Sequence, residues 1–528
     1  MMRPSQFGVT AGIAGGGLSR RQLLAALGGA GVAIGLSSCE VVTDPDADRA
    51  SPSPSRRYNI PDSGAKLPTG KVTFRWMDSG DLKALFEVPL FRAYEQKHPN
   101  ITVDYQDSPW DRINEVVPLG VRNGTAPDVF AKPNNVPVQV MINEGWVAPI
   151  DDIIPDFETW KSRFPDNAFI PGVHIFNDRT YTWPVTSSKR YAHMLMYDRE
   201  YLEDAGYDPE SEPLSWDDFR AAAKKVTQQG DGDYYGLMLN GQGLAGVVGA
   251  LAQVAGARGA GGPWIDWKTG EYAYTAPQVK QAFELLLAMK SDGSIFPGFL
   301  SLGDADARAR MPQRVAAMVF DGPWDIPEWP TINPDYDFGV AMPPSPTAGT
   351  WAPANYQETG SNQVFVYAKS KYKSIAGDLF SYMGSLEGQT NIVIASGGNL
   401  GSQWPEANDR ARRTDVLTDR SKAAWDIAER LMRMAPMVEV RSSEVVKVIL
   451  ELKPVTPTLA DIAQGIMSGQ LDDIDRALQD LKDRSEKNLD DAVAAARAKG
   501  ADVSRDLWVF PNWDPTKDYT PDMYADLA

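Results

Sequence analysis

The chain has 528 residues, of which 43% are hydrophobic and 23% charged, and its formal net charge is −18. This length exceeds one typical domain, and the composition is ordinary for a soluble globular protein. The acidity argues against nucleic acid as a partner, and the single cysteine excludes an intrachain disulfide or a metal site built from several cysteines.

The N-terminal segment predicts export. An apolar, uncharged run, Leu23–Leu36, follows two arginines; it is too short for an ordinary transmembrane helix but has the length of a signal-peptide core. The letters SRRQLL resemble a twin-arginine signal, an address that a receptor recognises. The letters LSSC, which end at Cys39, resemble the bacterial lipobox, in which the cysteine receives lipid and becomes the new N-terminus. We therefore predict a signal peptide over residues 1–38 and lipid attachment at Cys39; the alternative is a chance cysteine in an apolar leader.

A polar stretch separates this cysteine from the folded body. Residues 39–70 are rich in Asp, Ser, Pro and Gly and hold too little apolar surface for a core, so we predict a flexible, lipid-anchored linker. After Leu36 no apolar run is long enough to span a bilayer, and the lipid would be the only anchor. The body would then lie on the outer face of the cytoplasmic membrane, in the periplasm or at the cell surface.

The body opens with a strand, a helix and a strand. Lys71–Trp76 alternates large apolar residues with others, which predicts a strand. Apolar spacing from Leu82 to Tyr94 predicts a helix with an irregularity at Pro89, and Ile101–Tyr105 alternates as the next strand. Two strands joined through a helix indicate a parallel sheet.

Strands and helices continue to alternate along the chain. Predicted strands cover 128–131, 193–197, 234–240, 315–320, 337–342 and 363–368, and predicted helices cover 136–144, 247–257 and 277–290. Ser215 with Asp218 has the pattern of a capping box at the start of a further helix. From Lys422 the chain becomes mostly helical, and an amphipathic stripe of leucine and isoleucine follows Leu471.

Several segments, in this order, resemble the extracellular solute-binding proteins of ATP-binding-cassette (ABC) importers, of the maltose-binding type that captures carbohydrates. No single segment is specific, but their order and spacing are. The segments are YEQKHPNITV at 94–103, NGTAPDV at 123–129, EGWVAPIDD at 144–152, Trp183-Pro184, MYDR at 196–199, SWDDF at 215–219, AAM to GPW at 316–324, and 469–493. A polar insert at 343–357 and a tail after Asp502 depart from the family pattern.

The resemblance implies an α/β fold with two lobes, the periplasmic-binding-protein-like fold of type II, with the ligand cleft between the lobes and a helical C-terminal part. We expect lobe 1 to hold 71–185 and 345–392, lobe 2 to hold 186–344 and 393–500, and 501–528 to be a separate tail. It also implies hinge closure on a carbohydrate, which we expect to be an oligosaccharide, and delivery of this ligand to ABC permease subunits. We further expect a monomer without catalysis, cofactor or metal.

A sugar needs aromatic side chains for its apolar faces and polar side chains for its hydroxyls. Trp324 is the leading aromatic candidate because it follows a strand and a Gly-Pro turn and matches the family's stacking tryptophan, with Asp321 and Trp329 nearby. The alternative for Trp324 is packing within a turn. The other candidate ligand-binding residues are Asp78, Ser79, Asp81, Asn134, Asn135, Trp183, Lys189, Asn240, Gln242 and Trp264.

Some of these candidates have a structural alternative. Asp78, Ser79 and Asp81 could instead cap a helix, and asparagines such as Asn134 and Asn135 are common in turns. Trp264 follows a glycine-rich stretch that suggests an exposed loop.

Other functions remain open at this point. The three histidines have no metal-ligand spacing, and no nucleophile-elbow motif occurs. An exported polysaccharide-active enzyme with two catalytic carboxylates is the main alternative, although no acid pair stands out among the 70 acidic residues. A different polar solute, such as a polyol, a glycerol phosphodiester or a peptide, is the other; Lys132, Lys189 and Arg190 leave an anionic ligand open.

Overall fold

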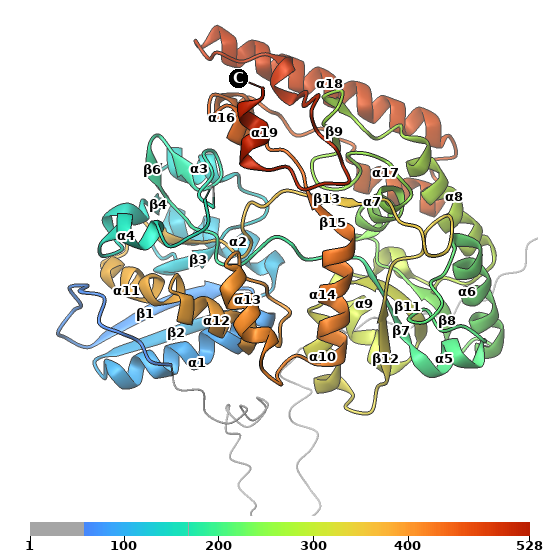
Figure 1. Ribbon diagram of the computed structural model, residues 1–528, viewed down its shortest axis with the longest axis horizontal. Helices are drawn as coiled ribbons and strands as arrows, with labels where there is room; N and C mark the ends of the chain where they lie inside the picture. Colours follow the sequence, from blue (N-terminus) through green and yellow to red (C-terminus); the bar gives the residue numbers. More distant parts are fainter. Residues whose placement is uncertain (1–57, 167, 528) are drawn as a thin grey trace, which may run out of the picture. The chain divides into compact units, whose positions relative to one another are not determined.

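The computed structural model describes residues 58–166 and 168–527 (Figure 1). The predicted signal peptide, the lipid site at Cys39 and residues 39–57 of the predicted linker lie outside the described residues. Two β-sheets with helices around them form the described part, which is the predicted α/β class. Among these residues no helix combines the length and the apolar character needed to cross a bilayer.

The first sheet forms from the predicted strand–helix–strand opening. β1 pairs in parallel with β2 and β3, whereas β14 runs antiparallel to β3 and β4. Phe74 and Trp76 of β1 are buried because alternate residues of a strand point to the same face. The strand order is β2 (Ile101–Asp107), β1 (Val72–Asp78), β3 (Val129–Ala131), β14 (Val364–Tyr367) and β4 (Val147–Ala148).

Helices and a small hairpin surround this sheet. Apolar residues of α1 and α11 share one buried cluster with Phe74 and Trp76. The elements are α1 (Asp81–Lys97), α2 (Trp110–Asn123), α3 (Val138–Asn143), η1 (Ile150–Asp152), α4 (Phe157–Lys161), β5 (Ile175–Phe176), β6 (Arg179–Thr180), α11 (Lys373–Met383), α12 (Leu386–Ala395) and α13 (Pro405–Arg412).

The second sheet has the order β12 (Phe338–Ala341), β7 (Met194–Asp198), β11 (Ala316–Asp321) and β8 (Tyr235–Met238). β11 runs parallel to β8, and β7 runs antiparallel to both β11 and β12. Its helices are α5 (Arg199–Asp204), α6 (Trp216–Gly230), α7 (Leu244–Val254), α8 (Pro277–Ser291), η2 (Phe299–Ser301), α9 (Asp304–Arg310), η3 (Met311–Gln313), α10 (Asp325–Ile332) and α14 (Asp419–Leu431). The predicted capping box of Ser215 and Asp218 is confirmed at the start of α6.

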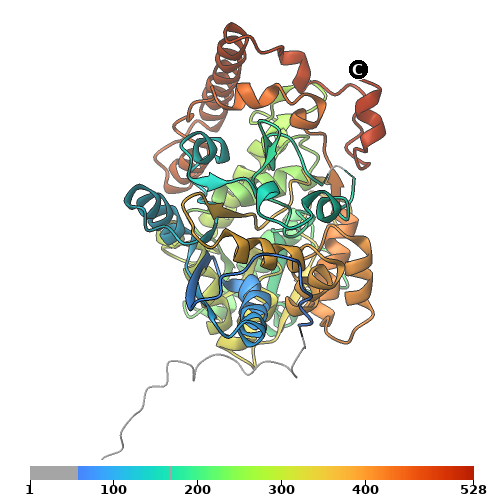
Figure 2. The same cartoon turned by 90° about the vertical axis from the view of Figure 1, so that its left-hand side faces the viewer.

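The C-terminal part is helical, as predicted. It contains α15 (Val438–Arg441), α16 (Val445–Ile449), α17 (Leu459–Ser468), α18 (Ile474–Ala498), η4 (Arg505–Trp508) and α19 (Pro521–Ala525), with the short pairs β9 (Ile265–Asp266) and β10 (Glu271–Tyr272), and β13 (Ala354–Tyr356) and β15 (Met432–Met434). Figure 2 shows α18 and the C-terminal helix at the same end of the molecule.

The C-terminal tail is part of the core. Trp508, Phe510 and Trp513 are buried in one cluster with residues of α16 and α18. The backbone amide of Phe510 donates to the Trp267 carbonyl at 2.6 Å, so the tail is also bonded to β9 and its surroundings. Residues 501–528, expected to stand apart, therefore hold the C-terminal helices together.

Part of the predicted linker is folded, which corrects the prediction for residues 58–70. The ring of Tyr58 lies 6.0 Å from that of Phe86, and Ile60 is buried in the core of the first sheet. The side chain of Asn100 donates to the Pro68 carbonyl at 2.8 Å. The few apolar residues of this polar stretch are enough to hold it in place, because the core of the first sheet offers an apolar surface on which they pack.

Two segments pack with the opposite lobe from the one predicted. Ser345 forms a bridge with Ser215, and Ala354 is buried beside β7 and β11, so this stretch belongs with the second sheet. Leu400 is buried in the core of the first sheet, with Trp404 against it. The chain crosses from one sheet to the other after each of these two segments. The lobe boundaries that we predicted from the family pattern therefore lie too early in the chain.

We predict that Trp513→Ala lowers the free energy of unfolding by about 3–5 kcal/mol, because it removes a large, fully buried side chain. Urea unfolding followed by tryptophan fluorescence and circular dichroism measures this. Lys517→Ala, at an exposed position of the same tail, is the control and should change stability by less than about 0.5 kcal/mol. Equal stability of Trp513→Ala and the native chain would contradict the assignment of the tail to the core.

Candidate functional site

Three chain segments meet where the chain passes from one sheet to the other. Thr186 and Ser361 form an antiparallel bridge, with backbone N–O distances of 3.2 and 2.9 Å, and their hydroxyl oxygens lie 2.7 Å apart. The backbone amide of Ser187 donates to the Gly401 carbonyl at 2.8 Å, which adds the loop after α12. We call these three segments, 184–191, 356–363 and 398–404, the crossing segments.

Glu358 bonds the crossing segments to one another. Its carboxylate accepts from the Ser187 hydroxyl at 2.6 Å and from the Ser188 amide at 2.7 Å. It also accepts from the Gln403 side chain at 3.2 Å. One carboxylate of the second segment thus holds partners from the other two, and hydrogen bonds to a charged group are stronger than neutral ones.

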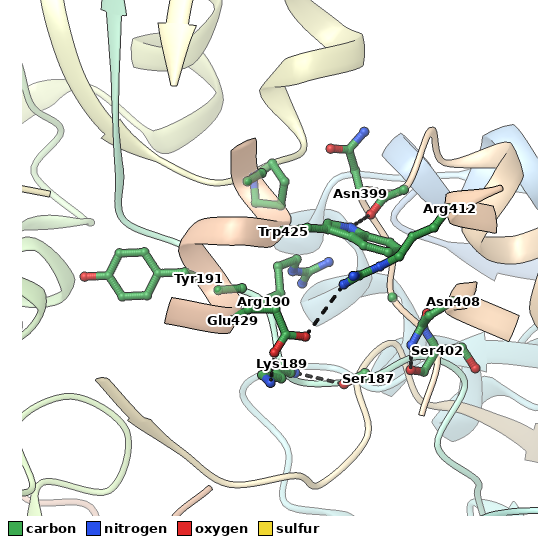
Figure 3. Close-up of a pocket in the computed structure, with 15 residues that line it drawn as sticks. Ser187, Lys189, Arg190, Tyr191, Asn399, Ser402, Asn408, Arg412, Trp425 and Glu429 are labelled. Atoms are coloured by element: carbon green, nitrogen blue, oxygen red, sulfur yellow. Dashed lines mark hydrogen bonds and ion pairs between the residues drawn. The ribbon is translucent and has the colours of Figure 1, made fainter. Parts of the chain in front are cut away.

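A cavity of about 110 Å³ lies beside the crossing segments (Figure 3). Its wall comes from the first and third crossing segments, from Pro323 after β11, and from α13 and α14. It is smaller than the roughly 300–1,000 Å³ of typical ligand pockets, so a ligand of that size would need a wider form of the cavity. The cavity joins parts of the chain that pack with different sheets, which is where a hinge would change its size.

Charged and aromatic side chains line this cavity. The Lys189 ammonium lies 2.7 Å from the Glu429 carboxylate, and the Arg412 guanidinium lies 3.8 Å from it. Arg412 also lies over the indole of Trp425, 4.7 Å from the ring centre, and the Trp425 Nε1 donates to the Gly398 carbonyl (Figure 3). An indole and several polar groups in one wall suit a ligand that has both apolar and hydroxylated faces.

Arg190 and Trp324 adjoin each other at this cavity. The Arg190 guanidinium lies 5.3 Å from the centre of the Trp324 ring, and burial lowers the pKa of Arg190 from its ordinary value. The ring of Trp324 also lies against Gly322, where an added Cβ would approach it to 2.3 Å. Glycine at this turn therefore permits the position of the indole.

The predicted residue Asp321, at the end of β11, lies in a buried acidic cluster. Burial and the charge of Asp304 raise the pKa of Asp321 to about 7, and burial and the charge of Asp321 raise the pKa of Asp325. The Arg308 Nε lies 3.6 Å from the Asp325 carboxylate. Asn240 is near this cluster, with its side chain 3.5 Å from that of Asp304, while Gln242 is exposed.

The predicted residues at the end of β1 are engaged within the protein. Asp78 is fully buried and pairs with the Lys83 ammonium, which also lies 4.9 Å from the Trp110 ring centre. Ser79 is buried, and its amide donates to the Asp78 carboxylate at 2.6 Å. Asp81 begins α1, but its side chain lies outside what the structure describes.

The remaining predicted residues fall into two groups. Asn134 and Asn135 are exposed, and both bond to Asn114, at 2.7 and 3.4 Å, which agrees with the turn alternative. Trp264 stacks on Tyr274 with ring centres 5.2 Å apart. Neither site adjoins the cavity beside the crossing segments.

Two predicted tryptophans are core residues, which corrects their assignment as ligand contacts. Trp183 has no exposed surface and lies in an aromatic cluster, 5.7 Å from Trp160 and 5.8 Å from Phe380 by ring centres. Trp329 has no exposed surface either and packs on Phe338 at 4.8 Å. Both side chains fill the apolar core beside a sheet. This burial determines their position, although polar residues adjoin them in the sequence.

The sequence prediction missed most residues of the cavity, among them Asn408, Arg412, Trp425 and Glu429. These four lie on helices α13 and α14, whose charged faces are typical of solvent exposure. A tryptophan four positions before a glutamate on one helix was the available signal, since such residues share a face.

Two sheets, chain segments that cross between them, and a polar and aromatic cavity at the crossing define a two-lobed binding protein. Residues 79–390 match the family model described as bacterial extracellular solute-binding protein. This match covers more than half of the chain, and the chain belongs to that family.

The curated relatives include a binding protein of Brucella abortus (strain 2308) and one of Brucella suis biovar 1 (strain 1330). Each is 26% identical over 292 residues, which is 55% of this chain and 66% of the relative. The chain thus matches slightly less than two thirds of the length of these relatives.

Several solved structures share the fold. The GacH receptor of Streptomyces glaucescens, with 18% identity and a TM-score of 0.55, covers 79% of this chain and 98% of its own. MalE of Bdellovibrio bacteriovorus, with 20% identity and a TM-score of 0.55, covers 79% and 100%. A solute-binding protein of Thermotoga lettingae, with 18% identity and a TM-score of 0.57, covers 80% and 100%. These similarities confirm the predicted two-lobed fold.

The acidic cluster predicts a pH dependence of stability. The pKa of Asp321 is about 7 in the folded chain and lower, near 3.9, when unfolded, so the folded state binds more protons between these values. The stability that this proton contributes is present at low pH and is lost as the pH rises through 7. The asparagine of Asp321→Asn has no carboxyl proton to lose. We therefore predict that this variant becomes more stable relative to the native chain as the pH rises from 5 to 8. Urea unfolding of both proteins at each pH measures the difference.

Asp208→Asn is the control for this comparison, because the pKa of Asp208 is lowered by hydrogen bonds from Ser211 rather than raised. Its stability relative to the native chain should show no gain over the same pH range. A constant stability difference between Asp321→Asn and the native chain from pH 5 to 8 would contradict a raised pKa at Asp321.

Proposed function

We propose that this chain is the substrate-capturing component of an ABC importer and that its ligand is a carbohydrate, in particular an oligosaccharide. The two lobes would close on the ligand about the crossing segments, and permease subunits would receive it from the closed form. A ligand favours the closed state only through contacts that it makes there. Catalysis forms no part of this proposal.

The observation that carries the proposal is the cavity beside the crossing segments. Side chains from segments that pack with either sheet meet there, so opening and closing of the lobes would directly change the site. Trp425 supplies indole surface, and Asn399 and Asn408 supply amide groups for hydroxyls. These are the residue types that a sugar ring with apolar faces and a polar rim requires.

Structures with this fold support a saccharide as the ligand. The GacH receptor was solved in complex with acarbose, MalE of Bdellovibrio bacteriovorus with maltotriose, and the Thermotoga lettingae protein with α-D-tagatose. At identities of 18–20% their binding residues do not transfer to this chain, and the class of ligand is our proposal.

We further propose that the chain acts outside the cytoplasm as a monomer held by lipid at Cys39. The family is extracellular, and the N-terminal pattern of apolar run, small residues and cysteine is that of a lipoprotein. Mass spectrometry of the chain expressed in a bacterium tests the anchor directly. An N-terminus at Cys39 with a diacylglyceryl mass supports it, and an unmodified residue 39 contradicts it.

The central test measures the binding of saccharides to the purified full chain by calorimetry and by thermal unfolding. Maltotriose, xylotriose, cellotriose, glycerophosphocholine and a tripeptide serve as the panel. A ligand at a hundredfold excess over its dissociation constant stabilises the folded state by about 2.7 kcal/mol. We predict such a stabilisation by at least one saccharide, and chromatography should recover that saccharide unchanged.

Trp425→Ala should weaken saccharide binding about tenfold, which corresponds to about 1.4 kcal/mol, because it removes indole surface from the cavity. Trp216→Ala removes a partly buried indole at the start of α6, outside the cavity, and is the control with unchanged affinity. Stabilisation by the tripeptide or phosphodiester alone would contradict the carbohydrate proposal, and hydrolysis of an oligosaccharide would contradict the absence of catalysis.

A further inference from the structure

Arg190 lies in the cavity without an anionic partner. Its guanidinium stacks over Trp324 at 5.3 Å, and among the described residues no carboxylate or carbonyl forms an ion pair or hydrogen bond with it. Among the other partly buried arginines, Arg199, Arg308 and Arg314 each lie close to a carboxylate. Arg75, Arg433 and Arg441 donate to backbone carbonyls instead, and Arg310 lies over the Phe296 ring. Within the described part of the chain, Arg190, like Arg310, has neither a carboxylate nor a carbonyl partner, and its N–H groups are available to a ligand.

The cavity as a whole is positively charged. Lys189, Arg190 and Arg412 supply three cations to its wall, and Glu429 supplies the one carboxylate among the lining residues. Glu429 already pairs with Lys189 and Arg412. A cationic cavity in a chain with a net charge of −18 is a local reversal of charge, and such a reversal favours an anionic ligand.

A second polar group in the wall is also unsatisfied. Asn399 is 3% exposed, and its Nδ2 donates to the Ser396 carbonyl at 2.7 Å. Its Oδ1 is buried and, among the described residues, has no hydrogen-bond donor. A buried acceptor without a donor costs free energy. Because this oxygen has almost no accessible surface, a ligand hydroxyl would satisfy it only in a form of the protein in which the wall around Asn399 has opened.

We propose that the ligand is an acidic saccharide, with an oxyanion that pairs with Arg190 and a hydroxyl that donates to Asn399. This rests on the proposed function and deepens it by naming the class of sugar. The oxyanion is a carboxylate, as in a uronic acid, or a phosphate, as in a sugar phosphate; both accept two hydrogen bonds from one guanidinium.

The stacking of Arg190 on Trp324 supports this role. A guanidinium that lies over an indole ring keeps its N–H groups in its own plane, where its edge can still donate to a planar oxyanion. Partial burial lowers the pKa of Arg190 from its ordinary value, while the side chain keeps part of its surface exposed, so a ligand can still reach the guanidinium.

The first test compares matched ligands on the full native chain by calorimetry. Digalacturonic acid is measured against its methyl ester, and glucose 6-phosphate against glucose, at low and at physiological salt. We expect one acidic member to bind at least about tenfold more tightly than its neutral counterpart, with weaker binding at higher salt. The pair that shows the difference identifies carboxylate or phosphate.

The second test changes the arginine. Arg190→Gln should abolish the preference for the acidic member, and Arg190→Lys should restore part of it, because lysine keeps the charge but loses the paired N–H groups. Arg430→Gln is the control, because this substitution removes the same charge from the same region. Arg430 lies on α14, outside the cavity, with its guanidinium 4.5 Å from the centre of the Trp351 ring. This variant should keep the preference. Circular dichroism establishes that each variant is folded, and the comparison of ligands on the native chain needs no variant.

Two outcomes overturn the inference, and they are distinguishable. Equal binding of acidic and neutral saccharides, unchanged in Arg190→Gln, would overturn it while the carbohydrate proposal stands. Binding of inorganic phosphate with no saccharide of either kind bound would overturn both, because the cavity would then hold a simple anion.

Discussion

The crossing segments are bonded to one another, and this constraint positions the rest of the site. Thr186 and Ser361 join two segments by a backbone bridge, and Ser187 adds the third through the Gly401 carbonyl. Glu358, on the second segment, then accepts hydrogen bonds from the other two. These bonds hold Lys189 and Arg190 on the first segment and Asn399 on the third in one wall of the cavity. The hinge that we propose lies in this region, so the wall would persist while the lobes rotate.

The fold could be predicted from the sequence because its signals are local. The alternation in β1, the capping box of Ser215 and the proline that begins α8 each specify an element without any long-range contact. The wrong predictions concern segments whose structure depends on contacts with distant parts of the chain. Ile60 is in a polar stretch, yet it is buried because the first sheet needs cover, and the tail after Asp502 forms a core with α16 and α18.

The site could be predicted only in part, for the same reason. Lys189, predicted from its place near a crossing, lines the cavity, whereas Trp324, predicted from its place after a strand, is not a lining residue but lies beside Arg190. Trp183 and Trp329 have equally suggestive neighbours but are core residues. Trp425 and Arg412 lie on separate helices and meet only when α13 and α14 come together. Residues joined by tertiary packing leave no pattern of spacing in the chain.

We propose that the lobes move about the crossing segments when a ligand binds. Spin labels at Arg122→Cys, on α2 beside the first sheet, and Gln228→Cys, on α6 beside the second, report the distance between the lobes in a Cys39→Ser background; both positions are exposed. Electron-electron double resonance measures that distance with and without a saturating saccharide. We predict that the ligand shifts the distances between the two spin labels to a different, narrower distribution. An identical distribution with the ligand bound would contradict the hinge.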